Sequence, residues 1–123
     1  MENQHQSFTE LEVWKKARVL KNDTKELTNK FPGYEKYRLA DQLIRSSRSI
    51  NSNIAEGHGR FTYKDQLHFC IQARGSLSET YNHLIDAFDE QYISKEELQF
   101  FKVRIAEVER ILNGYINFLR RSI

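Results

Sequence analysis

The chain has 123 residues and a mass of 14.7 kDa, with 39% hydrophobic and 12% aromatic residues. This fits one globular domain with its own core and excludes an intrinsically disordered chain. One Pro and five Gly are too few for a many-turned β-sandwich, and a single cysteine excludes a disulfide framework or a multi-cysteine zinc cluster.

No apolar run approaches the roughly 18 residues that a membrane span needs. The first seven residues, MENQHQS, have neither a basic n-region nor an apolar h-region, so we expect no signal peptide and a cytoplasmic location. The formal net charge is +2, but it is unevenly spread. Residues 36–74 carry seven basic and three acidic groups, whereas residues 1–35 balance to zero and residues 75–123 are slightly acidic. Such a basic middle segment indicates an anion-binding face or electrostatic contacts between subunits.

The first predicted helix covers residues 9–31. Ser7 followed by Glu10 resembles a capping box before it, and Pro32-Gly33 stops it. Its apolar seam recurs at steps of three and four residues, as an amphipathic helix requires. The seam is Val13, Ala17, Leu20, Thr24, Leu27 and Phe31.

The second predicted helix covers residues 35–56. Four serines within residues 46–52 make it narrow, so a neighbouring helix can approach closely. Gly57 stands where a left-handed C-cap is expected. The seam is Ala40, Leu43, Ser47, Ile50 and Ile54.

The third predicted helix begins after Thr62, which is a good N-cap with Asp65 three residues later. Gly75 lies inside it at a cost of about 1 kcal/mol relative to Ala. Together with the small residues around it, Gly75 predicts close helix packing. The seam is Cys70, Ala73, Leu77, Tyr81, Leu84 and Phe88.

The fourth predicted helix begins at Ser94, which forms a clear capping box with Glu97. Because the loops are short, neighbouring helices must be antiparallel. The predicted fold is all-α, an antiparallel up-down-up-down four-helix bundle over residues 9–123 with a flexible tail over residues 1–8. The last seam is Leu98, Phe101, Ile105, Val108, Leu112, Tyr115 and Leu119.

The third and fourth helices carry apolar residues beyond one core stripe. Phe100, Ile111 and Phe118 fall in a narrow sector beside the fourth seam and form a second stripe. Covering such a stripe stabilises an assembly by roughly 1.5–3 kcal/mol for each large side chain fully buried. We therefore predict self-association, with an ordinary scatter of surface hydrophobic residues as the alternative.

Residues 45–57 hold the most informative polar pattern. Glu56 lies at a helix C-terminus, where the helix dipole disfavours an anion, and Asn53 lies one turn earlier on the same face. This pair predicts hydrogen bonding with a neighbouring helix or subunit, with Arg45, Arg60 or Arg74 as partners for Glu56. The alternative is a solvent-exposed pair beside a plain glycine cap.

Basic side chains are the remaining functional signal, because Phe61 and Tyr63 are interleaved with some of them. Basic groups alternating with aromatic rings can bind phosphates and stacked bases. The alternative is a solvated face with ion pairs between subunits. The candidate nucleic-acid-binding residues are Arg45, Arg48, Arg60, Lys64 and Arg74.

We find no catalytic constellation. The chain has no Glu-x-x-His motif, which di-iron bundles require on two helices, and no His pair four residues apart. Cys70 lies on the core seam and is interpreted as a small buried hydrophobic residue. We therefore expect a protein that is not an enzyme and has no metal and no cofactor.

Three segments resemble the 23S rRNA intervening-sequence proteins, a family of four-helix bundles, over about residues 8–120. They are Leu-Glu-Val-Trp-Lys-Lys-Ala at residues 11–17, Ser-Ile-Asn-Ser-Asn-Ile-Ala-Glu-Gly at residues 49–57, and Gly-Ser-Leu-Ser-Glu at residues 75–79. The accessory protein of diversity-generating retroelements is similar to the same family. The matching signature positions are Asn53, Glu56, Gly57, Gly75 and Glu79.

The resemblance implies a small bacterial protein that forms a five-subunit ring. It also implies that a relative binds a reverse transcriptase and nucleic acid through a basic surface. We therefore expect a non-enzymatic oligomeric scaffold that binds RNA, DNA or a nucleic-acid enzyme. A protein–protein scaffold without a nucleic-acid role is the alternative.

Overall fold

A computed structural model describes residues 7–123, and within them the chain forms four long helices and no strand. The predicted all-α class with four helices is confirmed. Three short 3-10 turns, η2 (Phe8–Glu10), η3 (Thr28–Lys30) and η4 (Gly33–Glu35), lie before α2. The long helices are α1 (Glu12–Leu27), α2 (Leu39–His58), α3 (Tyr63–Asp89) and α4 (Lys95–Ser122).

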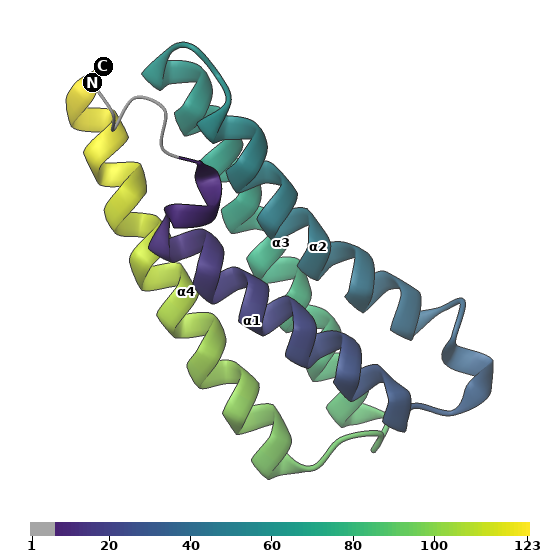
Figure 1. The fold of residues 1–123 in the computed structure, drawn as a ribbon. Coiled ribbons are helices and arrows are strands. Elements are labelled where there is room, and N and C mark those ends of the chain that lie inside the picture. Colours follow the sequence, from purple (N-terminus) through teal and green to yellow (C-terminus); the bar gives the residue numbers. More distant parts are fainter. Residues whose placement is uncertain (1–6) are drawn as a thin grey trace.

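The four helices lie side by side, and successive helices run in opposite directions along the long axis (Figure 1). Each helix packs on its chain neighbours, and α1 also contacts α4, which closes the bundle. The 16 residues of α1 are far fewer than the 27 of α3 and the 28 of α4. As a result, α1 covers only part of the length of its neighbours.

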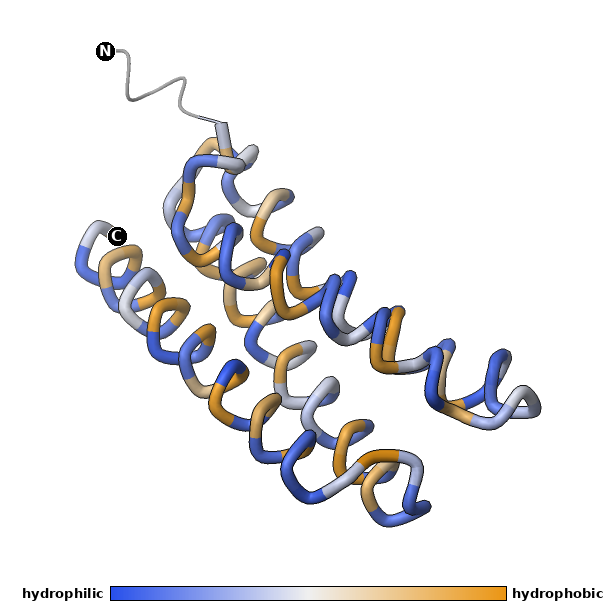
Figure 2. The backbone as a smooth tube through the Cα atoms, turned by 60° about the horizontal axis from the view of Figure 1, so that its bottom comes forward, coloured by the Kyte–Doolittle hydropathy of each residue, from blue (hydrophilic) through white to orange (hydrophobic). Residues whose placement is uncertain are grey.

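The core follows the predicted seams most closely on the two N-terminal helices. Every predicted seam residue of α1 and α2 is buried, as is Phe31 after α1. Hydrophobic residues recur along each helix at the spacing of successive turns (Figure 2). On the longer α3 and α4, Tyr81 and Tyr115 are only half-buried and Phe88 is exposed, whereas Thr80 and Ile116 are buried. A strict alternation of three and four drifts by about 20° in every seven residues, and this error accumulates over long helices.

The structure shortens the first predicted helix at both ends. Leu11 is extended, with ψ 128°, and separates η2 from α1. At the other end the Thr28 hydroxyl donates to the Lys25 carbonyl at 2.6 Å, where the chain tightens into η3. Ser7 caps η2 and Phe8 contacts the edge of Trp14 at 5.2 Å between ring centroids. Of the tail predicted over residues 1–8, residues 1–6 lie outside the described residues.

The second predicted helix begins four residues late, at Leu39, and ends two residues late, at His58. Arg38, with φ −120° and ψ −108°, is not helical. The Glu35 carboxylate accepts a hydrogen bond from the backbone N–H of Leu39 at 3.2 Å. Glu35 therefore lies in the preceding turn η4, outside α2, and its side chain caps the first residue of α2.

The predicted starts of the last two helices are confirmed. Thr62 Oγ1 accepts from the N–H of Asp65 at 3.1 Å. Ser94 and Glu97 form the reciprocal capping box, at 3.0 and 2.8 Å. Between α3 and α4, Gln91 adopts a left-handed φ of 66° and Tyr92 N–H bonds the Ala87 carbonyl at 2.9 Å. This turn ends α3 without a glycine, which is why no sequence signal marked it.

The predicted left-handed cap at Gly57 is wrong. Gly57 lies inside α2, is buried, and has no positive φ. A β-carbon at this position would lie 3.0 Å from Cβ of Phe69 and 3.1 Å from the carbonyl oxygen of Gln66, both on α3. Glycine is favoured here because a methyl group would be in tighter than ordinary contact with α3.

The opposite correction applies to Gly75. We expected this residue to admit a neighbouring backbone, but it is exposed and a β-carbon there would meet nothing within 4 Å. In this part of α3 the contact with α2 is made by hydroxyl groups. Ser49 Oγ lies 2.9 Å from Ser76 Oγ, and Thr80 Oγ1 donates to Ser46 Oγ at 2.9 Å.

No helix among residues 7–123 combines the length and the apolar character that crossing a membrane requires.

Gly57→Ala and Gly75→Ala should change stability in opposite directions. At Gly57, overpacking costs roughly 1–3 kcal/mol and the better helix propensity of Ala recovers about 1, so the free energy of unfolding should fall. At Gly75 only the propensity gain applies, and the free energy should rise by about 0.5–1 kcal/mol. Urea unfolding followed by circular dichroism measures both. A stabilised Gly57→Ala variant would contradict the close packing described above.

Candidate nucleic-acid interface

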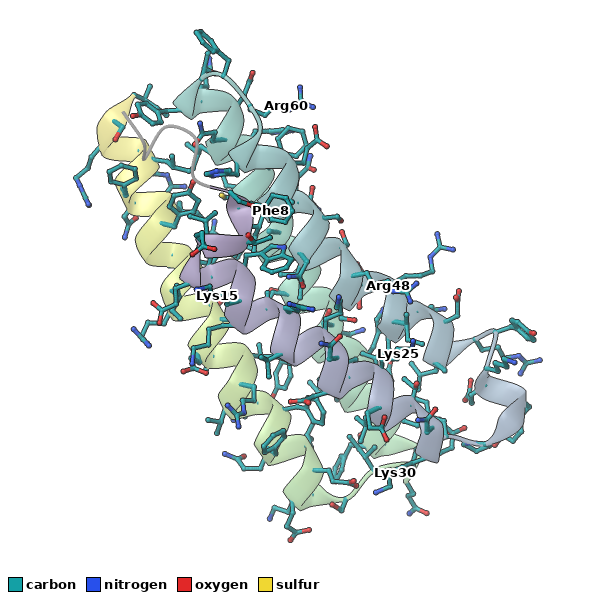
Figure 3. The ribbon with its side chains drawn as sticks, viewed as in Figure 1. Phe8, Lys15, Lys25, Lys30, Arg48 and Arg60 are labelled. Atoms are coloured by element: carbon teal, nitrogen blue, oxygen red, sulfur yellow. The ribbon has the colours of Figure 1, made fainter. Side chains whose placement is uncertain are left out.

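The five basic residues predicted to bind nucleic acid do not lie on one surface. Arg45 and Arg48 lie one turn apart on α2, and both are exposed. Arg60 follows the end of α2, and Lys64 and Arg74 belong to α3. Arg48 and Arg60 are twelve residues apart, which is about 18 Å along a helix, and Figure 3 shows them well separated along α2.

Arg60 is already engaged within the chain. Its Nη2 lies 2.8 Å from Oε2 of Glu56, and its guanidinium lies over the ring of Phe69, 4.6 Å from the centroid. Arg60 is thus the one of the three predicted partners that pairs with Glu56. Because 53% of the Glu56 side chain is exposed, this ion pair is a surface contact that stabilises the fold weakly.

The two basic candidates of α3 lie apart from Arg48. Arg74 Nη1 donates to Oδ1 of Asn113 on α4 at 3.0 Å, so its side chain lies between α3 and α4. Lys64 is exposed in the first turn of α3. Its neighbour Tyr63 meets Phe118 of α4 edge-on, at 6.3 Å between ring centroids.

A different basic surface lies between α1 and α2. Two hollows of about 300 and 120 Å³ adjoin there, and they share Lys25 and Ile44 in their walls. We call them together the α1–α2 groove. Figure 3 shows Lys25 and Arg48 on this face, where α1 and α2 lie side by side. The basic residues that line the groove are Lys21, Lys25, Lys36 and Arg48.

The groove has a strongly one-sided charge. No acidic residue is among those that line it, and none of its four cations forms an ion pair with another described residue. Like charges gathered at a concave surface reinforce one another and raise the local concentration of anions. Among the described residues, the groove therefore offers four cations to an anion without an acidic residue in its wall.

Helical charge segregation on α1 produces this surface. Lys21 and Lys25 lie on the flank that faces α2, whereas Asp23 and Glu26 line a hollow on the flank that faces α4. Counting charges over residues 1–35 gave zero and concealed the separation. Plotting α1 at 100° per residue would have found it, because Arg18, Lys21 and Lys25 follow steps of three and four.

The signature residue Asn53 binds within its own helix. Its Nδ2 donates to the Ser49 carbonyl at 2.9 Å and lies 3.0 Å from Ser49 Oγ. Ser49 Oγ in turn meets Ser76 Oγ of α3. Asn53 thus orients a serine that joins α2 to α3, and its hydrogen bonds within residues 7–123 all go to its own helix.

The signature residue Glu79 pairs with His83 one turn further along α3. His83 Nε2 lies 3.3 Å from Oε2 of Glu79, whose side chain is 60% exposed. His83 itself is buried, and its Nδ1 has no hydrogen-bond partner among the described residues. Glu79 therefore covers the accessible edge of a buried imidazole.

The described residues contain no group of three or more His, Cys, Asp or Glu side chains that could hold a metal ion. Cys70 is buried in the core, and burial raises the pKa of its thiol to about 11. At neutral pH this thiol is protonated, which makes it a poor nucleophile.

Glu56→Ala tests whether the observed surface pair is the whole role of Glu56. An exposed ion pair stabilises a fold by about 0.2–1 kcal/mol, so the loss in the free energy of unfolding should stay below about 1 kcal/mol. Chemical denaturation of the wild-type protein and the variant measures the difference. A loss of several kcal/mol would mean that Glu56 is also bound by a neighbouring subunit.

Comparison with known proteins agrees with this architecture. A solved structure from Bacteroides thetaiotaomicron, described as a protein with unknown function from the S23 ribosomal protein family, superposes with a TM-score of 0.78. It shares 22% sequence identity and covers 85% of this chain and 97% of its own, so the likeness concerns the fold. No curated protein matches the chain.

The model of one protein family covers most of the four helices. It is described as the 23S rRNA-intervening sequence protein family, and it matches residues 9–114. The matched range includes all five signature positions and every cation of the α1–α2 groove. The resemblance that rested on three short segments is therefore confirmed, and the chain belongs to the 23S rRNA-intervening sequence protein family.

Proposed function

We propose that this chain is a non-enzymatic, oligomeric binding module of the bacterial cytoplasm that holds the phosphate backbone of RNA or DNA in the α1–α2 groove. The observation that carries the proposal is the gathering of Lys21, Lys25, Lys36 and Arg48 without an acidic neighbour in the groove wall. Phosphate contacts of this kind supply most of sequence-independent nucleic-acid binding.

The groove also has room for a backbone. The larger hollow has a volume of about 300 Å³, and its wall between the two helices includes the apolar residues Phe31, Ala40 and Ile44. Apolar walls lower the local dielectric constant, which strengthens the attraction between the cations and a phosphate. The ion pairs of the described chain lie elsewhere, so none of them has to break before a phosphate binds.

Assembly into a ring, as the family resemblance implies, belongs to the same proposal. Part of the predicted second stripe is exposed on α4, where 45% of Phe100 is accessible. Val103, at 58%, extends it, and both line a hollow that also holds charges of either sign, such as Arg104 and Glu107. A surface that combines apolar residues with both charges suits a head-to-tail contact between copies, which is the kind that closes a ring.

A protein scaffold without a nucleic-acid role is the second candidate. The same exposed residues of α4 favour it, because a partner protein could cover them in place of another copy. The two candidates differ in the surface they use and in their response to salt. Nucleic-acid binding depends on the groove cations and weakens steeply as salt rises, whereas docking on Phe100 and Val103 does not.

Removing groove cations should weaken binding to nucleic acid and flatten its salt dependence. Lys25→Ala and Arg48→Ala should each lower affinity about threefold at low salt. Each should also reduce the slope of log affinity against log salt by about 0.7–0.9. Fluorescence anisotropy with a labelled mixed-sequence RNA, between 50 and 200 mM salt, measures both quantities.

Lys15→Ala is the matched control for these variants. Lys15 is an exposed cation of the same helix, ten residues from Lys25, and does not line the groove. Its loss should leave the salt slope nearly unchanged. If all three variants reduce binding equally, diffuse positive charge and not the groove holds the nucleic acid.

Val103→Asp should reduce the mass of the assembly. A carboxylate introduced among the exposed apolar residues of α4 would be desolvated in the contact between copies, which is costly. Light scattering should then give a smaller mass with unchanged helix content. Lys102→Asp, an exposed neighbour outside this hollow, should preserve the mass. If the mass of the Val103→Asp assembly is unchanged, the subunit contact does not involve this face of α4.

A further inference from the structure

Two exposed tyrosines stand at one end of the α1–α2 groove. Between α1 and α2 the chain passes through η4 and the turn that follows it, and this segment contains Tyr34 and Tyr37. The exposed fraction of Tyr37 is 82% and that of Tyr34 is 66%. Aromatic rings that remain this exposed contribute little to the core, so packing within the chain does not explain them.

Tyr37 is coupled directly to the groove. The Lys36 ammonium lies over the Tyr37 ring, 5.5 Å from its centroid, and Lys36 also lines the larger hollow. A group that bound in this hollow through a phosphate would therefore end within reach of the Tyr37 ring. Charge and aromatic surface thus occur together at one place on the chain.

Tyr34 is held with its ring outward. Tyr92 donates its hydroxyl proton to Glu35 at 2.6 Å, so the Tyr34 hydroxyl, 3.3 Å from that of Tyr92, is the donor to the Tyr92 oxygen. The hydrogen bond from Tyr92 is also the main cause that keeps the pKa of Glu35 low. A hydrogen bond at the hydroxyl restrains the direction of the ring axis, which reduces the conformational entropy that a stacking partner would have to overcome.

The one acidic residue of this segment does not oppose an anion in the groove. Both carboxylate oxygens of Glu35 are occupied, one by the Tyr92 hydroxyl and the other by the backbone N–H of Leu39. Glu35 is absent from the residues that line either hollow. The Glu35 carboxylate therefore caps the first turn of α2 and holds the hydroxyl of Tyr92, which in turn binds Tyr34.

We infer that Tyr34 and Tyr37 form a base-stacking platform at the end of the α1–α2 groove, and that the ligand is single-stranded RNA or DNA. This inference rests on the proposed function and narrows its ligand class. In a duplex the bases are stacked on one another and unavailable to a protein ring, whereas unpaired bases stack on aromatic side chains regardless of sequence. A groove of cations that ends in exposed rings is the arrangement that single strands require.

The aromatic residues that the sequence placed in a basic loop fit this role less well. Phe61 is 99% exposed, but the adjacent Arg60 is paired with Glu56 and lies over Phe69. Tyr63 is partly occupied by Phe118. Neither residue is adjacent in the chain to a residue that lines the α1–α2 groove, whereas Tyr34 follows Gly33 and Tyr37 follows Lys36, and both Gly33 and Lys36 line it. Phe61 is therefore a matched control, as an exposed ring beside a cation that is already neutralised.

The test compares a labelled oligouridine 12-mer with a blunt 12-base-pair duplex, using the full chain in its native assembly. The single strand should bind more tightly than the duplex. Tyr37→Ala should lower single-strand affinity about 5- to 100-fold and leave the salt slope unchanged. Tyr37→Phe should retain binding, because it keeps the ring, and Phe61→Ala should have little effect.

Several outcomes would overturn the platform. They are equal affinity for the duplex, an unchanged affinity in Tyr37→Ala, or an equal loss in Phe61→Ala. In each case salt-dependent binding through Lys25 and Arg48 would persist, and the proposed function would stand without the platform. Failure to bind either nucleic acid even at 50 mM salt would instead remove the proposed function itself. Circular dichroism of each variant separates a binding defect from a folding defect, because both tyrosines lie outside the core.

Discussion

The structure depends on how closely α2 lies on α3. Gly57 leaves no side chain between the two backbones, since a single β-carbon would meet the Gln66 carbonyl at 3.1 Å. Further along, hydroxyl contacts from Ser46 and Ser49 replace the large side chains that would hold the helices apart. Small residues permit the approach, and the hydrogen bonds favour one register of the two helices over a neighbouring one. The family signature around residues 49–57 is thus explained first by packing, and it places α2 before any ligand is considered.

One flank of α2 packs on α3, and another flank forms the wall of the candidate binding groove with α1. Asn51 Nδ2 donates to the Trp14 carbonyl at 3.1 Å, which ties α2 to α1 near the start of α1. Towards the other end of α1, Lys25 and Arg48 line the same hollow between the two helices. Asp23 and Glu26 of α1 lie on its other flank, where Lys30 of η3 pairs with Glu97 of α4. Packing of the core therefore fixes where the charged side chains lie as well as where the apolar ones lie. As a result, the chain has a basic α1–α2 groove although its net charge is small.

Periodicity and capping residues were sufficient to predict four helices, the core of α1 and α2, and the starts of α3 and α4, because these features depend on local sequence. Two of the errors came from features that depend on a second segment of the chain. Gly57 lies near a helix end, and its role is visible only beside Gln66 and Phe69 of α3. Arg60 and Arg74 have the charge that nucleic acid requires, but Glu56 and Asn113 already engage them. A third error concerned Lys21 and Lys25, because the sum of charges over residues 1–35 is zero. That sum cannot show that the helix places its basic and acidic side chains on different flanks.

In the proposed assembly, joining several copies through α4 would compensate for the weak affinity of a single groove. Four cations in water hold a phosphate backbone only weakly, because exposed ion pairs stabilise a complex by about 0.2–1 kcal/mol each. A strand that contacts one groove and can reach another binds the second at a high effective concentration, so repeating the groove around a ring raises avidity without any new contact. Because α1 and α2 form the groove whereas Phe100 and Val103 lie on α4, joining copies through α4 leaves each groove open. In the proposed assembly, therefore, subunit contact and strand binding use different helices, and a substitution on α4 should weaken nucleic-acid binding only through the loss of the ring.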